Sequence, residues 1–222
     1  MPTKPFVVAR DQAPEGHALR GAVVAIGNFD GVHRGHQAVI AATRVRAQAL
    51  GRPAAALTFE PHPRAFFNPG EPLFRLTDEA AKLRLLASTE LDGVIVLTFD
   101  AALAGLTAEE FVARVLVERL AVSGAVIGFN FHFGMSRAGS PDFLAAEGRK
   151  RGFAVDVVPQ FEDRGRAVAS GPIRDALAAG RVAEAAEVLG YPWFVSGAVV
   201  HGDKRKLRPA AGPRWWKKRV RG

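Results

Sequence analysis

The sequence has 222 residues, enough to bury a full core in one large domain, or in one domain and a fragment of another. It contains no cysteine, which excludes disulfides, thiolate metal sites and a cysteine nucleophile and is typical of a reducing compartment. No apolar run approaches the ~20 residues that span a bilayer, and the N-terminus lacks the apolar stretch of a signal peptide. We therefore expect a soluble, cytoplasmic protein without membrane contacts.

The formal net charge of +8 is concentrated at the end of the chain. Residues 204–222 carry nine basic side chains and no acidic one. Taking these nine from the 30 basic side chains leaves 21 in residues 1–203, against 22 acidic ones. The body of the protein is thus close to neutral, and short tails of one charge are usually solvated. We expect a disordered tail over residues 206–222 and no nucleic-acid partner.

Short apolar runs alternate with helical patterns along most of the chain. The runs are continuously apolar, as in strands buried on both faces of a parallel sheet; they cover residues 22–27, 54–59, 93–99, 125–129 and 154–158. Capping residues begin predicted helices between them, near residues 36–50, 77–88, 107–120 and 140–151. This order predicts an α/β fold with a doubly wound parallel sheet, whose ligands bind at the carboxyl ends of the strands.

A glycine-rich turn links the first of these strands to its helix, within residues 25–36. Backbone N–H groups and the positive helix end converge there, which makes an anion site. His33 and His36 are three residues apart and share a face of a helical turn. The turn therefore predicts a site that binds phosphates and turns them over. Asp30 is either a helix cap or a direct ligand.

Two further segments lie where other predicted strands end. Residues 60–63 read Glu-Pro-His-Pro, which is either a rigid loop fixed by its prolines or a ligand site. Residues 129–133 alternate phenylalanine with polar side chains, and core packing is the default role of such rings. His62 and His132 have no partner at ligand spacing, so we expect no protein metal site.

The pattern changes after residue 166. Two short helices are predicted, at residues 173–179 and 182–189, and Arg174 near the first either binds phosphate with Ser170 or pairs with Asp175. Residues 193–200 then alternate like the first strand of a new unit, with 22 residues after them.

These segments together resemble the bacterial bifunctional riboflavin kinase/FMN adenylyltransferases (FAD synthetases). The similarity runs from about Arg20 to about Arg205 and rests on four motifs in the same order, at residues 25–36, 60–63, 128–134 and 170–174. The resemblance implies a Rossmann-like nucleotidyltransferase fold. It also implies transfer of AMP from ATP to FMN, which yields FAD and pyrophosphate, with Mg²⁺ accompanying the ATP.

The resemblance also assigns residue roles. His33, His36 and Arg174 would be catalytic and contact the ATP phosphates, with Ser170 and Arg174 on the β- and γ-phosphates. Further ATP-binding residues would be Gly27, Asn28, Phe29, Asp30 and Gly35. Flavin-binding residues would be Glu60, Pro61, His62, Pro63, Asn130 and Phe131. The family usually has two adjacent serines where this chain has Ala169-Ser170, so one phosphate contact, worth ~1 kcal/mol, is expected to be missing.

The end of the chain departs further from the family. Residues 199–205 resemble the opening of the riboflavin kinase barrel, but residues 206–222 lack the glycine-rich turn and the Pro-Thr motif that should follow. We expect an adenylyltransferase domain at 1–190, with a short helical segment, then an incomplete β module at 191–205 and a basic tail at 206–222. We expect a monomer or weak oligomer.

Two alternatives remain at this point. One is a nucleotidyltransferase for another phosphate substrate, such as nicotinate or pantetheine phosphate. The other is a remnant that binds flavin or ATP without useful turnover.

The departure generates a prediction about the kinase activity. Because residues 206–222 lack the kinase motifs, the purified 222-residue chain should not phosphorylate riboflavin. Incubation with ATP, Mg²⁺ and riboflavin, followed by separation of the products, checks this, and appreciable FMN would contradict it.

Overall fold

The computed structural model describes residues 5–11, 18–71, 73–163 and 166–197. Six strands form one sheet in which every described pair of neighbours is parallel. The strands are β1 (Val7–Arg10), β2 (Val23–Ile26), β3 (Ala54–Glu60), β4 (Gly93–Thr98), β5 (Gly124–Gly128) and β6 (Ala154–Val158), in the order β1-β4-β3-β2-β5-β6. The predicted doubly wound α/β sheet is confirmed, and β1 was not predicted.

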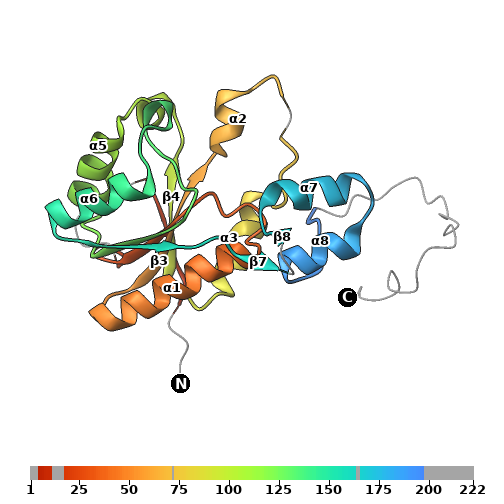
Figure 1. The fold of residues 1–222 in the computed structure, drawn as a ribbon, viewed down its shortest axis with the longest axis horizontal. Helices are drawn as coiled ribbons and strands as arrows, with labels where there is room; N and C mark the ends of the chain where they lie inside the picture. Colours follow the sequence, from red (N-terminus) through yellow and green to blue (C-terminus); the bar gives the residue numbers. More distant parts are fainter. Residues whose placement is uncertain (1–4, 12–17, 72, 164–165, 198–222) are drawn as a thin grey trace, which may run out of the picture.

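Helices cover both faces of this sheet (Figure 1). One core joins α1 (Arg34–Leu50) and α3 (Glu79–Ala87) to the sheet. The other core lies under α5 (Ala108–Glu110), the π-helical η1 (Phe111–Arg119) and α6 (Pro141–Arg151). The shorter elements are α2 (Pro63–Phe67), α4 (Ala101–Ala104), η2 (Met135–Arg137), β7 (Glu162–Asp163) and β8 (Arg166–Ala167). Each face of the sheet thus has its own apolar core, as the unbroken apolar strands require.

The chain changes direction in the sheet at β2. From β2 it winds outward through β3 and β4, then returns to β5 on the other side of β2 and continues to β6. Ligands bind outside the carboxyl ends of the strands at such a switch point. The fold therefore places the predicted phosphate turn, after β2, beside the segment that follows β5.

A third, smaller core holds the last two helices against the edge of the domain. Helices α7 (Ser170–Ala178) and α8 (Val182–Leu189) enclose Leu76, which lies in the loop before α3. Figure 1 shows the pair beside the sheet, next to α3. This core fixes the start of α7 close to the turn after β2.

The strand predicted at residues 193–200 is not found in its described part. Residues 193–197 form no strand; the Trp193 indole donates to the Leu76 carbonyl (2.9 Å) and its ring packs against Phe74. Residues 198–200 lie outside the described residues, as do the rest of the expected β module and the basic tail, at residues 201–222. None of the helices in the described part of the chain is long and apolar enough to cross a bilayer.

Candidate active site

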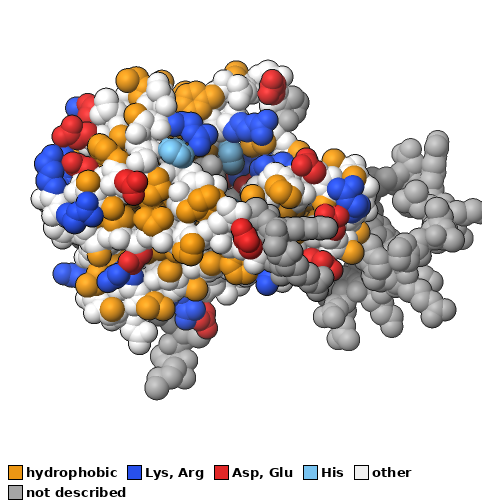
Figure 2. Space-filling model, in the orientation of Figure 1, with side chains coloured by type: hydrophobic (Ala, Val, Ile, Leu, Met, Phe, Trp, Pro, Cys, Tyr) orange, Lys and Arg blue, Asp and Glu red, His pale blue; other side chains and the backbone are white. Residues whose placement is uncertain are grey.

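A cavity of about 680 Å³ opens at the switch point of the sheet. Its walls come from the turn after β2, the start of α1, α2, the loop after β5 and the start of α7. Figure 2 shows histidine and arginine side chains gathered at a hollow on this face of the molecule. Most of the site residues predicted from sequence line this cavity: Gly27, Asn28, Phe29, Asp30, His33, Gly35, His36, His62, Pro63, Asn130, Phe131, Ser170 and Arg174.

Two stacked histidines form one end of the cavity. His33 is the N-cap of α1, and its Nδ1 accepts a hydrogen bond from the backbone N–H of His36 at 3.3 Å. The two rings lie 3.7 Å apart, centroid to centroid, and 16° from parallel. Because Nδ1 of His33 is an acceptor, the proton of the neutral ring is on Nε2.

Both histidines are neutral at neutral pH. Burial lowers the pKa of His33 to about 4, with Asp30 opposing the shift and Arg174 adding to it. Burial, together with His33 and the Lys82 ammonium, lowers the pKa of His36 well below its usual value. Nδ1 of His36 is buried and has no hydrogen-bond partner within the described part of the chain. His33, whose Nδ1 is an acceptor, therefore carries its proton on Nε2, as a hydrogen-bond donor.

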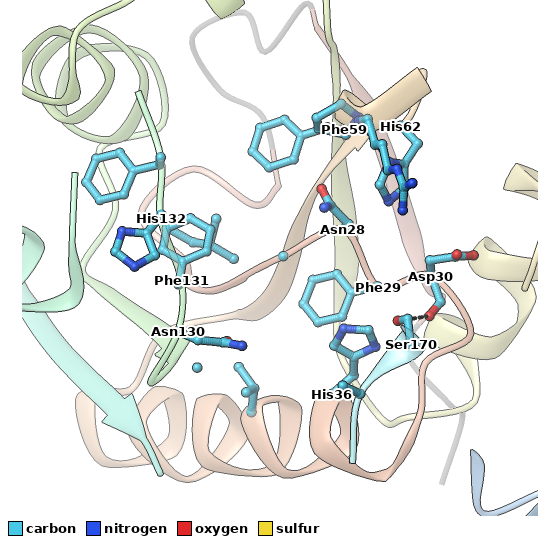
Figure 3. A pocket seen from close by; sticks show the side chains of 18 of the residues that line it. Asn28, Phe29, Asp30, His36, Phe59, His62, Asn130, Phe131, His132 and Ser170 are labelled. Carbon is cyan, nitrogen blue, oxygen red and sulfur yellow. Dashed lines mark hydrogen bonds between the residues drawn. The ribbon is translucent and has the colours of Figure 1, made fainter. Parts of the chain in front are cut away.

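The start of α7 meets the turn after β2. Ser170 Oγ donates to the Asp30 carbonyl at 3.2 Å, a contact drawn in Figure 3. A side chain at Gly35 would lie 3.2 Å from the His33 ring and 3.3 Å from the Val168 carbonyl, so glycine permits this approach. The first residues of α1 and α7, among them Gly35 and Ser170, thus line the same cavity, and the positive ends of two helices there favour an anion.

Asp30 organises this region without capping α1. Its carboxylate is 2% exposed and accepts from Leu76 N, from Thr77 N and Oγ1, and from Arg174 Nη2 at 2.5 Å. Arg174 Nε also donates to the Phe74 carbonyl at 2.7 Å. Arg174 is therefore paired with Asp30 and not with Asp175, and the cap of α1 is His33.

The opposite end of the cavity is aromatic. Phe131 stacks on Phe133 with ring centroids 5.4 Å apart, and Phe133 contacts Phe111. Figure 3 shows Phe131 and His132 across the cavity from Asn28 and Phe29, with Asn130 near His36. Phe59, Phe67 and Phe99 complete this wall. The cavity therefore has a polar, donor-rich end and an apolar, ring-lined end.

The Glu60–Pro63 segment divides between two roles. His62 and Pro63 line the cavity, and His62 Nδ1 caps α2 by accepting from Arg64 N at 3.1 Å. Glu60 and Pro61 do not line it. The Glu60 carboxylate instead pairs with Arg75 and Lys82, both at 2.6 Å. The structure thus brings only half of this predicted flavin segment into the cavity.

Several lining residues were missed from the sequence: Phe59, Arg64, Phe67, Phe99, Phe111, Arg137, Phe161 and Val168. Phe59 and Phe99 lie at the ends of predicted strands, a signal that could have found them. Arg137 has a left-handed backbone, with φ of 59°, and no pattern in the sequence indicates its place. The described residues contain no group of three His, Cys, Asp or Glu side chains that could hold a metal ion.

The buried histidines predict how stability depends on pH. Burial lowers the pKa of His33 and of His62 to about 4, against ~6.5 in an unfolded chain. Between these values the unfolded state binds more protons, so stability is full above pH ~6.5 and falls as the pH drops toward 4. His62→Gln should reduce the slope of the unfolding free energy against pH by about one proton.

Urea unfolding between pH 7 and 4 measures these slopes. His132→Gln makes the same substitution at an exposed position and shows what the change from histidine to glutamine does to folding in itself. Equal slopes for His62→Gln and wild type would contradict the prediction.

Two curated bacterial proteins are similar in sequence to this chain. A bifunctional riboflavin kinase/FMN adenylyltransferase from Pseudomonas fluorescens is 45% identical over 186 residues, which are 83% of this chain and 59% of the relative. Another, from Escherichia coli K12, is 38% identical over 193 residues, 87% of this chain and 60% of the relative. The chain thus spans about three fifths of the length of these relatives.

A solved structure described as a macrolide-efflux protein from Streptococcus pneumoniae has a similar fold. It matches with a TM-score of 0.72 and 26% identity, over 85% of this chain and 61% of that one. The family model for FAD synthetase matches residues 15–172, which is more than half of the chain. The protein belongs to the FAD synthetase family.

Proposed function

We propose that this chain is an FMN adenylyltransferase, which transfers AMP from ATP to FMN and releases pyrophosphate. The observation that carries the proposal is the two-ended cavity, in which a donor-rich end and an aromatic end share one space. A dinucleotide product with a phosphate bridge and a flavin ring needs both ends. The family and the curated relatives support the same reaction.

The donor-rich end is proposed to hold the phosphates of ATP. Nε2 of His33 and of His36 would each donate a hydrogen bond, and Ser170 and Arg174 would contact the β- and γ-phosphates. The turn that carries Gly27, Asn28, Phe29 and Gly35 lines the cavity and would bring the chain close to the nucleotide. Asp30 acts by holding Arg174, because its carboxylate is already used by four donors.

The aromatic end is proposed to hold the flavin ring. Phe131 and its neighbours offer an apolar slot, and Asn130, His62 and Pro63, which also line the cavity, would form the rim of the flavin site. Buried aromatic surface contributes about 25 cal/mol per Å², and stacked or edge-on rings add to it. Glu60 and Pro61 would support this rim from outside the cavity.

The reaction needs positioning and charge neutralisation more than a base. An oxygen of the FMN phosphate, already anionic at neutral pH, attacks the α-phosphorus of ATP. The new P–O bond forms as the bond from the α-phosphorus to the bridging oxygen breaks, and pyrophosphate leaves with that electron pair. The neutral histidines, Arg174 and the two helix N-termini stabilise the charge that develops.

Mg²⁺ is proposed to enter as the ATP complex. This ion is usually held by substrate phosphates, waters and at most one or two carboxylates. When bound, it would neutralise phosphate charge; the Asp30 carboxylate, saturated by protein donors, is not offered as its ligand. The absence of riboflavin kinase activity stays a prediction, since residues 198–222 lie outside the described residues.

His36→Ala tests the proposed function directly. Loss of one donor to the transition state should lower kcat for FAD formation about 100-fold, or ~3 kcal/mol, with the fold retained. His36→Gln keeps an N–H donor and should recover part of the rate. FAD from ATP and FMN, measured with coupled pyrophosphate release, gives the result, and near-wild-type turnover of His36→Ala would overturn the assignment.

Ala169 generates a second prediction. It occupies the N-cap of α7 with an extended backbone and no side-chain cap. The serine that the family usually has at this position would therefore cap the helix. The hydroxyl introduced by Ala169→Ser should accept a hydrogen bond from the N–H of Gly171. This should raise the free energy of unfolding by about 1 kcal/mol. Thermal unfolding checks this, with the exposed Ala41→Ser on α1 as the matched control, and an unchanged midpoint for Ala169→Ser would contradict it.

A further inference from the structure

Lys82 is a buried cation that the proposed reaction does not use. It lies on α3, its side chain is 1% exposed, and it does not line the cavity. Burying an ammonium group in a protein is strongly unfavourable unless a counter-charge and hydrogen bonds satisfy it. Its contacts therefore indicate what the residue does.

The polar contacts of the Lys82 ammonium lie at the carboxyl ends of β2 and β3. Nζ donates to Thr58 Oγ1 at 3.1 Å and to the carbonyls of Asn28 and Phe59 at 3.4 Å each. Its counter-charge is Glu60, at 2.6 Å. The ammonium thus joins the phosphate turn after β2 to the end of β3.

Glu60 is held in its charged form, which balances the charge of the Lys82 ammonium. Burial acts to raise its pKa, but hydrogen bonds from Arg75 and Lys82 outweigh burial and lower the pKa below its usual value. Arg75 binds the carboxylate with two hydrogen bonds, at 2.6 and 2.8 Å. The three charged groups form a network in which Glu60 binds both cations, and neither Glu60 nor Lys82 lines the cavity.

The Asn28 carbonyl is the point where this network meets the site. It accepts from Lys82 and also from Thr58 Oγ1, at 3.2 Å. The next residue, Phe29, has φ of 50°, a left-handed conformation that persists in a non-glycine residue only when its surroundings enforce it. Phe29 is 1% exposed and its ring meets that of His36 edge-on, with centroids 5.2 Å apart.

We propose that Lys82 is a positioning residue for the phosphate site: it clamps the Asn28 carbonyl to β3, holds Phe29 in its strained turn, and so places the His36 ring. Glu60 supplies the counter-charge and is a part of this clamp, not a ligand. The inference rests on the proposed function for its kinetic consequence, but its structural consequence can be measured without turnover.

The charge of Lys82 gives a separate signature. The titratable groups that act on His36 are His33, stacked upon it, and Lys82, while Phe29 packs on its edge. His33 and Lys82 both lower the pKa of His36, in addition to burial. Removal of the ammonium should therefore raise this pKa, which a purely packing role for the lysine stem would leave unchanged.

Lys82→Met in the full chain is the test, since methionine keeps most of the apolar stem. We expect kcat for FAD formation to fall at least tenfold, as misplacement by about 1 Å can cost about 100-fold. Lys150→Met is the matched control, because Lys150 is 63% exposed on α6, and it should keep the wild-type rate. A kcat for Lys82→Met within twofold of wild type would overturn the proposal.

The second measurement is the pKa of His36, followed by NMR on histidine-labelled protein and assigned with His36→Gln. It should rise in Lys82→Met and not in Lys150→Met; an unchanged value in Lys82→Met would overturn the electrostatic part. If the wild type forms no FAD, the proposed function fails, and this titration still tests Lys82.

Thr58→Val keeps the proposal falsifiable if Lys82→Met does not fold. Valine matches threonine in shape and keeps the ammonium with its direct bond to Asn28 (3.4 Å), but removes the hydroxyl that bridges them with shorter bonds (3.1 and 3.2 Å). We expect kcat to fall severalfold with the pKa of His36 unmoved. Full activity of a folded Thr58→Val would overturn the part of the proposal in which the Thr58 bridge clamps the Asn28 carbonyl.

Discussion

The buried carboxylate of Asp30 is the contact on which the candidate site depends. It joins the turn after β2, the loop at Leu76 and Thr77, and Arg174 on α7. These segments are up to 144 residues apart in sequence. Breaking a buried ion pair by removing one partner typically costs about 3–5 kcal/mol. Asp30 lies in the phosphate turn and its carboxylate binds Arg174 on α7, so its loss would remove the ion pair that holds Arg174 beside the turn that carries His33 and His36.

A second charged network lies close to this carboxylate, since the charge of Asp30 acts on both Arg75 and Lys82. Lys82, Glu60 and Arg75 join β3 to the Asn28 carbonyl without reaching the cavity. The two networks divide the phosphate turn between them, since one holds Asn28 and the other holds Asp30. Phe29 lies between these anchors in a left-handed conformation. The strain in this turn is thus maintained by charged groups on both sides, while the neutral histidines remain free to donate.

The sequence predicted those features that follow from periodicity and strand ends. Parallel strands end at one edge, so His33, His62, Asn130 and their neighbours could be placed together before the structure was known. Glu60 was misplaced because its partners, Arg75 and Lys82, follow on a loop and a helix whose approach depends on tertiary packing. The alternation from Trp193 onward predicts a strand. Alternation carries no information on the tertiary contact of the indole, which donates a hydrogen bond to the Leu76 carbonyl.

The central claim is that one cavity joins the α-phosphate of ATP to the phosphate of FMN. Separate incubations with ATP labelled at the α- or the γ-phosphorus, in the presence of FMN and Mg²⁺, test it most directly. The account predicts that the α-label appears in FAD and the γ-label in pyrophosphate, in equal amounts. A γ-label transferred to flavin, or an α-label that remains in free nucleotide while FMN is bound, would contradict it.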